Sequence, residues 1–306
     1  MLENIVPREM AMLFDKYVEI AYLSEIRMRI NQPIILNIAN KIYSINYNGL
    51  CGLDSGIICD KELIEKTIYI ATENSLYAST EQIKQGFITA ANGVRVGIGG
   101  QFVYNGEQVD NITNISSINI RVPHEVVGCS KNVMEYIYEN EKTLHNTLIL
   151  SAPGVGKTTL LRDIIHDLSN KEVYLNSLVI DERFEISGAQ NYMHAFDLGQ
   201  CADVLYGSKK AYGLSCGIRS MSPNVVFTDE IASLEDQEGI LYACNCGVKV
   251  VATMHALNLQ EYINKTELLD FFKYKVFTRY IVLSKRRGNG TIEGVYDNQF
   301  KLLYRD

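Results

Sequence analysis

A stretch of nine residues near the middle of the chain has the composition and spacing of a phosphate site. Ser151–Thr159 reads Ser-Ala-Pro-Gly-Val-Gly-Lys-Thr-Thr. It follows the apolar run Thr147–Leu150 and precedes a helical pattern that begins at Leu160. A strand, a glycine-rich turn and a Lys-Thr pair before a helix are typical of the phosphate-binding loop of nucleoside triphosphatases.

Each residue type in this loop has a physical task. Glycines let several backbone N–H groups converge on one anion, and the helix N-terminus adds partial positive charge. We expect Lys157 to contact the β- and γ-phosphates of ATP and the Thr158 hydroxyl to bind Mg²⁺. The remaining nucleotide-binding residues expected in this loop are Pro153, Gly154, Val155, Gly156 and Thr159. Ser151 replaces the first glycine of the motif, which a tight turn accepts if φ stays negative there.

A second apolar run ends in two carboxylates. Pro223–Glu230 reads Pro-Asn-Val-Val-Phe-Thr-Asp-Glu. We predict a buried strand, with Asp229 holding Mg²⁺ and Glu230 polarising the water that attacks the γ-phosphate. The same pattern alone also fits a structural strand that ends in a charged loop. The phosphate-binding loop upstream favours the catalytic interpretation.

A third predicted strand, Leu178–Ile180, also ends in acidic residues. In open α/β sheets, ligands bind at the carboxyl ends of the strands. Asp181, Glu182 and Glu185 are therefore expected to face metal or water, unless they only begin a solvated helix. Glu182 and Glu185 are both candidate catalytic residues, and their spacing does not decide which one faces the nucleotide.

A fourth predicted strand, Val248–Ala252, ends in polar residues at the same sheet edge. Thr253 is placed to orient water near the γ-phosphate. His255 is placed to sense the phosphate or to donate a hydrogen bond to it. The alternative for a single histidine at a strand end is a purely structural role.

Three arginines are candidates for the cation that phosphoryl transfer commonly requires near the γ-phosphate. Arg219 lies just before the second acidic motif, and Arg95 and Arg121 lie on predicted strands of the N-terminal region. Solvation or a structural ion pair is the ordinary alternative for each of them.

The elements that must position these residues change in pattern near Gly128. Residues 1–127 mix short helices and strands, which indicates a smaller α+β N-terminal domain. Residues 128–306 alternate strands and helices, which indicates an α/β domain with a mainly parallel sheet. In the first domain the periodicity predicts helices at 1–24, 60–72 and 75–85 and strands at 25–30, 34–38, 41–47, 87–89, 94–98 and 117–122.

Composition narrows the classes of function. The net charge of −7 disfavours a dedicated nucleic-acid binder. The seven cysteines include no Cys-x-x-Cys pair, which disfavours disulfide and four-thiolate zinc frameworks. No apolar run approaches the ~18 residues of a membrane span. We therefore expect a cytoplasmic protein without direct membrane insertion.

Four of these blocks, in this order, resemble the secretion ATPase superfamily of type II and type IV secretion systems and pilus motors. They are the phosphate-binding loop, the acidic strand end at 181–185, Asp229-Glu230 and the strand end at 253–255. Within that superfamily, shorter blocks along nearly the whole chain are similar to the stage III sporulation protein AA family. These blocks are Glu25–Arg29, Gln85–Thr89, Gly93–Gly97, Ile115–Arg121, Gly156–Asp163, Arg219–Pro223 and Arg279–Gly288.

The resemblance implies a RecA-like C-terminal domain that binds ATP and Mg²⁺, with Arg95 and Arg121 near the nucleotide. It also implies a homo-hexameric ring in the mother cell of an endospore-forming bacterium. There the ATPase would energise or assemble the channel to the forespore, docking at the membrane through membrane proteins of that channel.

Two other functions stay open from the sequence. One is a structural ring that binds ATP without hydrolysing it. The other is an ATPase coupled to nucleic acid, for which Lys285–Arg287 and the scattered tyrosines are the hints. The acidic total charge opposes nucleic acid as a partner.

Overall fold

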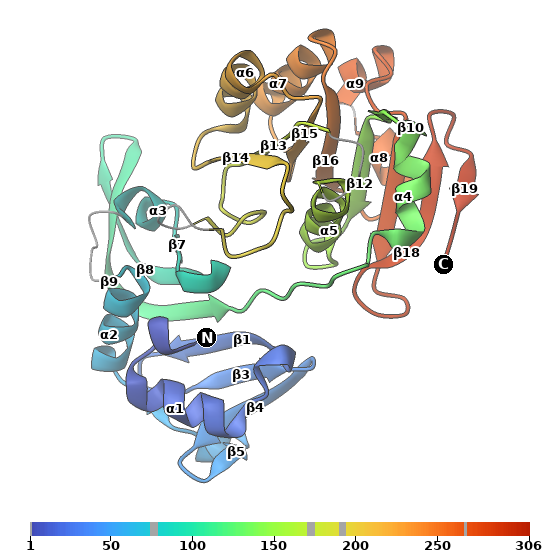
Figure 1. Cartoon of the computed structure of the whole chain (residues 1–306). Coiled ribbons are helices and arrows are strands. Elements are labelled where there is room, and N and C mark those ends of the chain that lie inside the picture. Colours follow the sequence, from blue (N-terminus) through green and yellow to red (C-terminus); the bar gives the residue numbers. More distant parts are fainter. Residues whose placement is uncertain (1, 74–78, 170–174, 190–193, 266–267) are drawn as a thin grey trace. The chain divides into compact units, whose positions relative to one another are not determined.

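The computed structural model describes residues 2–73, 79–169, 175–189, 194–265 and 268–306. The chain divides into two compact units (Figure 1). Unit 1 comprises Met1–His124 and Gly188–Ala195, and unit 2 comprises Glu125–Ser187 and Phe196–Asp306. That residues 1–127 and 128–306 fold as separate domains stays a prediction.

Unit 1 is built on an antiparallel seven-stranded sheet in the order β5-β4-β3-β1-β9-β8-β7. The strands are β1 (Leu23–Arg29), β3 (Ile35–Ile38), β4 (Lys41–Asn46), β5 (Gly49–Cys51), β7 (Phe87–Thr89), β8 (Arg95–Asn105) and β9 (Gln108–Arg121). The short strands β2 (Gln32–Pro33) and β6 (Ile58–Cys59) pair separately. The helices are α1 (Arg8–Tyr17), α2 (Lys61–Ala71) and α3 (Thr80–Lys84).

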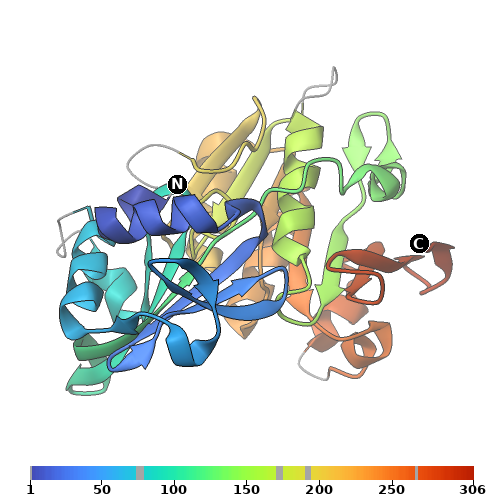
Figure 2. The same cartoon turned by 90° about the horizontal axis from the view of Figure 1, so that it is seen from below.

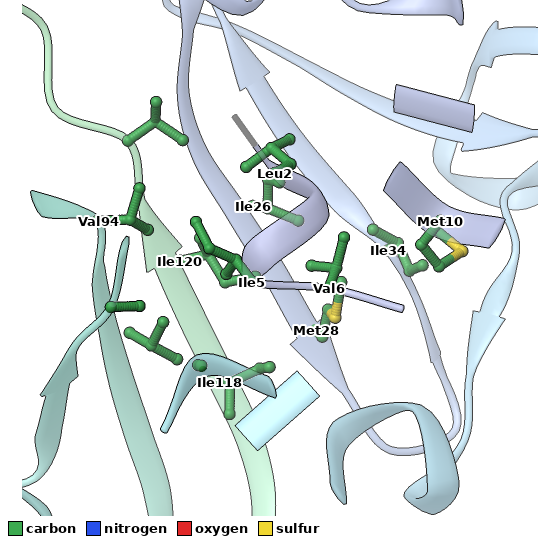
Figure 3. Packing of buried hydrophobic residues seen from close by; sticks show 14 of the residues in the cluster. Leu2, Ile5, Val6, Met10, Ile26, Met28, Ile34, Val94, Ile118 and Ile120 are labelled. Carbon is green, nitrogen blue, oxygen red and sulfur yellow. The ribbon is translucent and has the colours of Figure 1, made fainter. Parts of the chain in front are cut away.

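The core of unit 1 follows from the alternation of side chains along its strands. Ile26 and Met28 of β1 are fully buried, whereas Arg27 between them is exposed. Figure 3 shows the N-terminal residues Leu2 and Ile5 among the buried side chains of this sheet. The N-terminal segment is therefore part of the core that holds the sheet together.

The predicted helix over residues 1–24 is wrong at both ends. Pro7 is the N-cap of α1, because proline lacks an N–H group and suits a helix start better than its interior. The helix ends at Tyr17, since Val18 has extended backbone angles. Leu23 is fully buried in β1 and lies opposite Ile38. Of the predicted helix 75–85, residues 75–78 lie outside the described residues, and α3 covers 80–84.

Unit 2 has an eight-stranded sheet in the order β14-β13-β15-β16-β12-β17-β18-β19, in which the pairs β17–β18 and β18–β19 are antiparallel and the other pairs are parallel. The strands are β12 (Thr147–Ser151), β13 (Ser177–Asp181), β14 (Ala202–Tyr206), β15 (Val225–Thr228), β16 (Lys249–His255), β17 (Arg279–Ser284), β18 (Thr291–Asp297) and β19 (Leu302–Tyr304). A small separate pair consists of β10 (Tyr138–Asn140) and β11 (Thr143–Leu144). The predicted α/β class with a mainly parallel sheet is confirmed.

Helices cover both faces of this sheet, as Figures 1 and 2 show for α5 on one side and α6 and α7 on the other. The helices are α4 (Lys131–Ile137), α5 (Lys157–Ser169), α6 (Lys210–Met221), α7 (Leu234–Asn245), α8 (Leu259–Ile263) and α9 (Leu269–Lys273). Ile149 packs with α5, whereas its neighbours Leu148 and Leu150 pack with α6 and α7. The strands are thus buried on both sides, which explains their continuous apolar runs.

The parallel register brings the ends of four strands to one edge of the sheet. Ser151 of β12 lies opposite His255 of β16, and Thr228 of β15 lies opposite Ile180 of β13. The last residues of these strands and the loops that follow them carry the candidate residues. Within the described part of the chain, every helix is too short or too polar to cross a membrane.

Candidate functional site

The phosphate-binding loop connects β12 to α5 and has the backbone that its glycines predict. Gly154 and Gly156 have φ values of 68° and 120°, in the region where a side chain is strained. Ser151, by contrast, is the last residue of β12 and has no positive φ. A serine is therefore acceptable at this position of the motif.

Lys157 is buried at the start of α5, and acceptors from its own chain surround its ammonium group. The Nζ atom lies 3.1 Å from the carbonyl oxygen of Ser151, 3.2 Å from that of Ala152 and 2.9 Å from Nδ1 of His255. Burial lowers the pKa of Lys157 to about 8, although the Glu230 carboxylate acts in the opposite direction. The amine is thus held at the loop, at the expected position of a phosphate-binding lysine.

The Glu230 carboxylate contacts both His255, the partner of Lys157, and a second cation, Arg183. Its Oε1 atom lies 3.3 Å from Nε2 of His255, and its Oε2 atom lies 3.0 Å from Nη1 of Arg183. When Lys157 donates to Nδ1, the ring hydrogen of neutral His255 is on Nε2, facing the carboxylate. The result is a continuous chain from Lys157 through His255 and Glu230 to Arg183.

The backbone of Glu230 is strained and fixed by neighbours. Its φ is 38°, which is unusual for a residue with a side chain. Its N–H group donates to the hydroxyl of Thr253 at 2.8 Å. Thr253, which we expected to orient water, therefore uses its hydroxyl on the backbone of Glu230. A cavity of about 430 Å³ opens beside Glu230 and His255.

Asp229 has the surroundings expected of a metal ligand. It is 2% exposed, and its Oδ2 atom has no hydrogen-bond partner among the described residues. Burial, and then the nearby Asp181 carboxylate, raise the pKa of Asp229 to about 7. Buried acceptors are normally satisfied, and Mg²⁺ prefers hard oxygen donors. The buried oxygen of Asp229 is therefore suited to a hard cation, and the Thr158 hydroxyl as a second ligand stays a prediction.

Asp181 shapes its loop rather than facing solvent or metal. Its carboxylate is fully buried and accepts N–H groups of Glu185, Ile186 and Ser187 at 2.8–3.2 Å, as well as the Ser187 hydroxyl at 2.6 Å. Burial raises the pKa of Asp181, and these hydrogen bonds oppose the shift. The Asp181 carboxylate therefore fixes the backbone of the acidic turn through these hydrogen bonds.

The two glutamates of this turn differ in their surroundings. Oε2 of Glu182 lies 3.4 Å from Nζ of Lys210, the first residue of α6. Glu185 follows the turn and donates its backbone N–H group to Asp181. Sequence reasoning missed both Lys210 and Arg183. A lysine at a helix start and an arginine among acids look like ordinary solvated residues, and only the tertiary contacts distinguish them.

Arg219 lies at the other edge of the sheet in unit 2. Helix α6 starts at Lys210 beside the site and runs back to Met221, whose carbonyl oxygen accepts from Asn176 just before β13. Arg219 is exposed in the last turn, and its Nε donates to the carbonyl oxygen of Ser215. Within this unit, Arg219 is therefore not brought to Lys157.

Arg95 and Arg121 are neighbours in unit 1. They lie directly opposite each other on β8 and β9, and Glu25 of β1 lies opposite Arg121 on the other side. The Arg95 guanidinium also lies 4.0 Å from the ring centre of Phe87. Like charges directly opposite in a sheet are unfavourable, and the Glu25 carboxylate, which interacts with Arg121, offsets part of this repulsion.

Comparisons with known proteins agree with the fold. The family model described as sporulation stage III, protein AA, matches residues 2–303. The stage III sporulation protein AA of Bacillus subtilis (strain 168) is 31% identical over 309 residues, covering 99% of this chain and 97% of that protein. A protein designated ycf45 from Cyanidium caldarium is 23% identical over 156 residues, covering 48% of this chain and 42% of that one.

Solved structures with a similar fold include an ATPase and a pilus retraction motor. The ATPase DotB of Legionella pneumophila has a TM-score of 0.57 at 15% identity, covering 90% of this chain and 76% of that one. The pilus retraction motor PilT, crystallised with bound ADP, has a TM-score of 0.57 at 16% identity with the same coverage. The RecA-like α/β fold with a preceding N-terminal domain is thus confirmed.

Proposed function

Since this chain belongs to the sporulation stage III protein AA family, we propose that it is a Mg²⁺-dependent ATPase that works as a secretion-type motor. The observation that carries the proposal is the contact chain from Lys157 through His255 to Glu230, next to Asp229, which has one carboxylate oxygen without a hydrogen-bond partner in the described part of the chain. These groups come from three separate strand ends and meet at one edge of the sheet.

In the proposed reaction the loop and Lys157 hold the phosphates of ATP. The N–H groups of the loop and the start of α5 face the phosphate oxygens, as at other helix N-termini. Thr158 and Asp229 would hold Mg²⁺, which neutralises phosphate charge when bound. Glu230 accepts a hydrogen bond from a water molecule and polarises it for attack. The new bond joins the water oxygen to the γ-phosphorus, and the bond between that phosphorus and the oxygen of ADP breaks.

His255 links phosphate binding to the catalytic carboxylate. A bound γ-phosphate competes with Nδ1 of His255 for the Lys157 ammonium, now 2.9 Å away. When Lys157 turns to the phosphate, His255 is free to change its contact with Glu230. We therefore assign His255 the role of γ-phosphate sensor, which was one of its two expected roles.

The remaining candidates receive different proposed roles. Glu182 and Glu185 both stay candidates to face the nucleotide, and the Glu182 carboxylate contacts Lys210. Arg95 and Arg121 supply paired positive charge for phosphate. Arg219, at the opposite edge of unit 2, would act on the site of a neighbouring subunit. These assignments rest on the placement of each side chain in its own unit.

The cellular role that we propose follows from the family. A homo-hexameric ring in the mother-cell cytoplasm would dock to membrane proteins of the channel to the forespore and energise or assemble that channel. The net charge of −7 continues to disfavour a nucleic-acid partner.

ATP hydrolysis by the purified chain with Mg²⁺ tests the proposal. We expect turnover in the wild type, and a loss of at least about 100-fold in Lys157→Ala and in Glu230→Gln. Glu235→Gln, an exposed acid in α7, is the matched control and should keep the wild-type rate. Equal rates in all four proteins would contradict the proposal, and ATP binding without turnover would favour a structural ring.

A further inference from the structure

Lys210 is a buried cation at the site that the reaction described above does not use. It is the first residue of α6, and its side chain is 4% exposed. Lysine is almost never so buried unless it is paired. Its Nζ atom lies 3.2 Å from the carbonyl oxygen of Glu230, 3.4 Å from the Glu182 carboxylate and 3.9 Å from the Asp236 carboxylate. One ammonium group thus faces oxygen atoms from three segments.

Thr253 and Lys210 hold the two sides of the strained residue Glu230. The N–H group of Glu230 donates to Oγ1 of Thr253, and its C=O group accepts from Lys210. The next N–H group, that of Ile231, donates to the carbonyl oxygen of Thr253 at 2.9 Å. A left-handed backbone at a residue with a side chain persists only where its surroundings fix it.

Asp236 connects the same lysine to the start of α7. Its Oδ2 atom accepts the N–H groups of Ala232 and Ser233, each at 3.0 Å, and the Ser233 hydroxyl caps the helix in return. The residues that follow Glu230 are therefore tied to a helix N-terminus that lies beside Lys210. This arrangement leaves the segment from 230 to 233 little freedom.

We propose that Lys210 is a positioning residue for Glu230. Its ammonium group holds the Glu230 carbonyl, Thr253 holds the N–H group, and together they fix the backbone that directs the carboxylate. Glu182 acts through this lysine, because its negative charge keeps the buried ammonium in place. The inference deepens the proposed ATPase function and rests on it.

The variant Lys210→Met removes the charge and keeps most of the length of the side chain. It leaves the Glu230 carbonyl without its donor and the Glu182 carboxylate without its counter-charge. We expect kcat for ATP to fall about 10- to 100-fold, because small misplacements of a reacting group have effects of this size. The Kd of a fluorescent ATP analogue should stay within about twofold, and Lys210→Arg should recover most of the rate.

Lys209→Met is the matched control, because Lys209 is the neighbouring lysine, its side chain is exposed, and it makes a long ion pair of 3.9 Å with Glu235. It should keep the wild-type kcat. An unchanged kcat in Lys210→Met would overturn the inference. A loss of nucleotide affinity in Lys210→Met as large as the loss of kcat/KM would also overturn the inference, since such a loss indicates that Lys210 contacts a phosphate directly.

Two further measurements separate positioning from a general loss of structure. In a Glu230→Gln background, Lys210→Met should change the residual rate by less than about twofold, because the group that it positions is already gone. Thr253→Val, which removes the other contact, should lower kcat, while Thr253→Ser should not. A further tenfold loss in the double variant, or equal rates in the two Thr253 variants, would overturn the inference.

Backbone hydrogen exchange tests Lys210 without any reliance on activity. In Lys210→Met, protection of the amides of residues 230–233 should fall by about tenfold or more, while the amides of β12 keep theirs. If the amides of residues 230–233 keep their wild-type protection in Lys210→Met, the positioning role of Lys210 is overturned. A wild type without turnover would instead contradict the proposed ATPase, so the two failures are distinguishable.

Discussion

The site at the sheet edge consists of charged and polar residues that form hydrogen bonds and ion pairs with one another. Lys157 contacts His255, His255 contacts Glu230, and Glu230 contacts Arg183. Each of these residues can therefore change partner when a phosphate enters. Asp229 differs, because it is buried with one carboxylate oxygen unpartnered among the described residues.

Replacing His255 tests the link between the lysine and the glutamate. In His255→Ala, Lys157 still has the carbonyl oxygens of Ser151 and Ala152 as partners, so ATP binding should stay within about threefold of the wild type. We expect kcat to fall at least about tenfold, because the phosphate no longer influences Glu230. Steady-state hydrolysis and equilibrium ATP binding measure both numbers. His194→Ala, a substitution at an exposed histidine outside unit 2, is the control. An unchanged kcat in His255→Ala would contradict the sensor role.

The sequence was sufficient to predict which strand ends carry the candidate residues. Lys157, Glu230 and His255 belong to motifs whose order and spacing are informative, and the structure brings their side chains together. The catalytic roles of these residues stay predictions. Lys210 and Arg183 could not be found in this way, because nothing in a single sequence distinguishes a cation paired with a carboxylate of the site from a solvated one.

At the scale of elements, the start of α4 is tied to α5 by one buried carboxylate. Asp163 of α5 accepts the N–H groups of Gly128 at 2.9 Å and Ser130 at 2.6 Å, and Ser130 is the N-cap of α4. Burial alone would raise the pKa of Asp163, but these backbone hydrogen bonds bring it below the ordinary value.

Asp163→Asn should weaken this connection in a pH-dependent way. An amide has a single acceptor oxygen, so one N–H group loses its partner, at a cost of about 1–2 kcal/mol in the free energy of unfolding at pH 7. Because folding lowers the pKa, the contribution of the carboxylate is present above the unfolded pKa near 4 and is lost as the pH falls through the folded pKa.

The difference in stability between wild type and Asp163→Asn should therefore shrink in acid. Urea unfolding at pH 7 and at pH 3, followed by circular dichroism, measures it. Asp167→Asn, on the same helix and only partly buried, is the matched control. Equal stability of wild type and Asp163→Asn at pH 7 would show that the two hydrogen bonds do not stabilise the fold.

Periodicity predicted the elements well where one pattern dominates. The alternating residues of β1 and the continuous apolar runs of β12, β15 and β16 have the structures expected of them. The helix over 1–24 was too long, because the apolar spacing of its second half is also satisfied by a turn followed by a buried strand. The placement of Arg219 depends on the direction of α6, which its nearness to Asp229 in the sequence did not reveal.

At the scale of the whole molecule, the proposed motor has two units with separate cores. The site lies in unit 2, and the arginine pair Arg95 and Arg121 lies in unit 1. The proposed motor would use ATP hydrolysis at the site in unit 2 to produce movement, and assembly into a ring would let neighbouring molecules share that movement.

The mass of the assembly tests the proposed ring. The chain has a mass of 34.5 kDa, so a hexamer has six times that mass. We expect this species in the presence of ATP for Glu230→Gln, which cannot complete turnover, and less of it without nucleotide. Light scattering on a size-exclusion column distinguishes these masses. A monomer at every ATP concentration would contradict the ring.

The identity of the nucleotide bound to Glu230→Gln tests the division of labour within the site most directly. Wild type and variant are incubated with ATP and Mg²⁺, separated rapidly from free nucleotide, and the bound nucleotide is identified by chromatography. We predict ADP on the wild type and ATP on Glu230→Gln at a similar occupancy, because Lys157 binds the phosphates and Glu230 polarises the water. ADP on both proteins, formed at equal rates, would contradict the assignment of Glu230 as the group that activates the water.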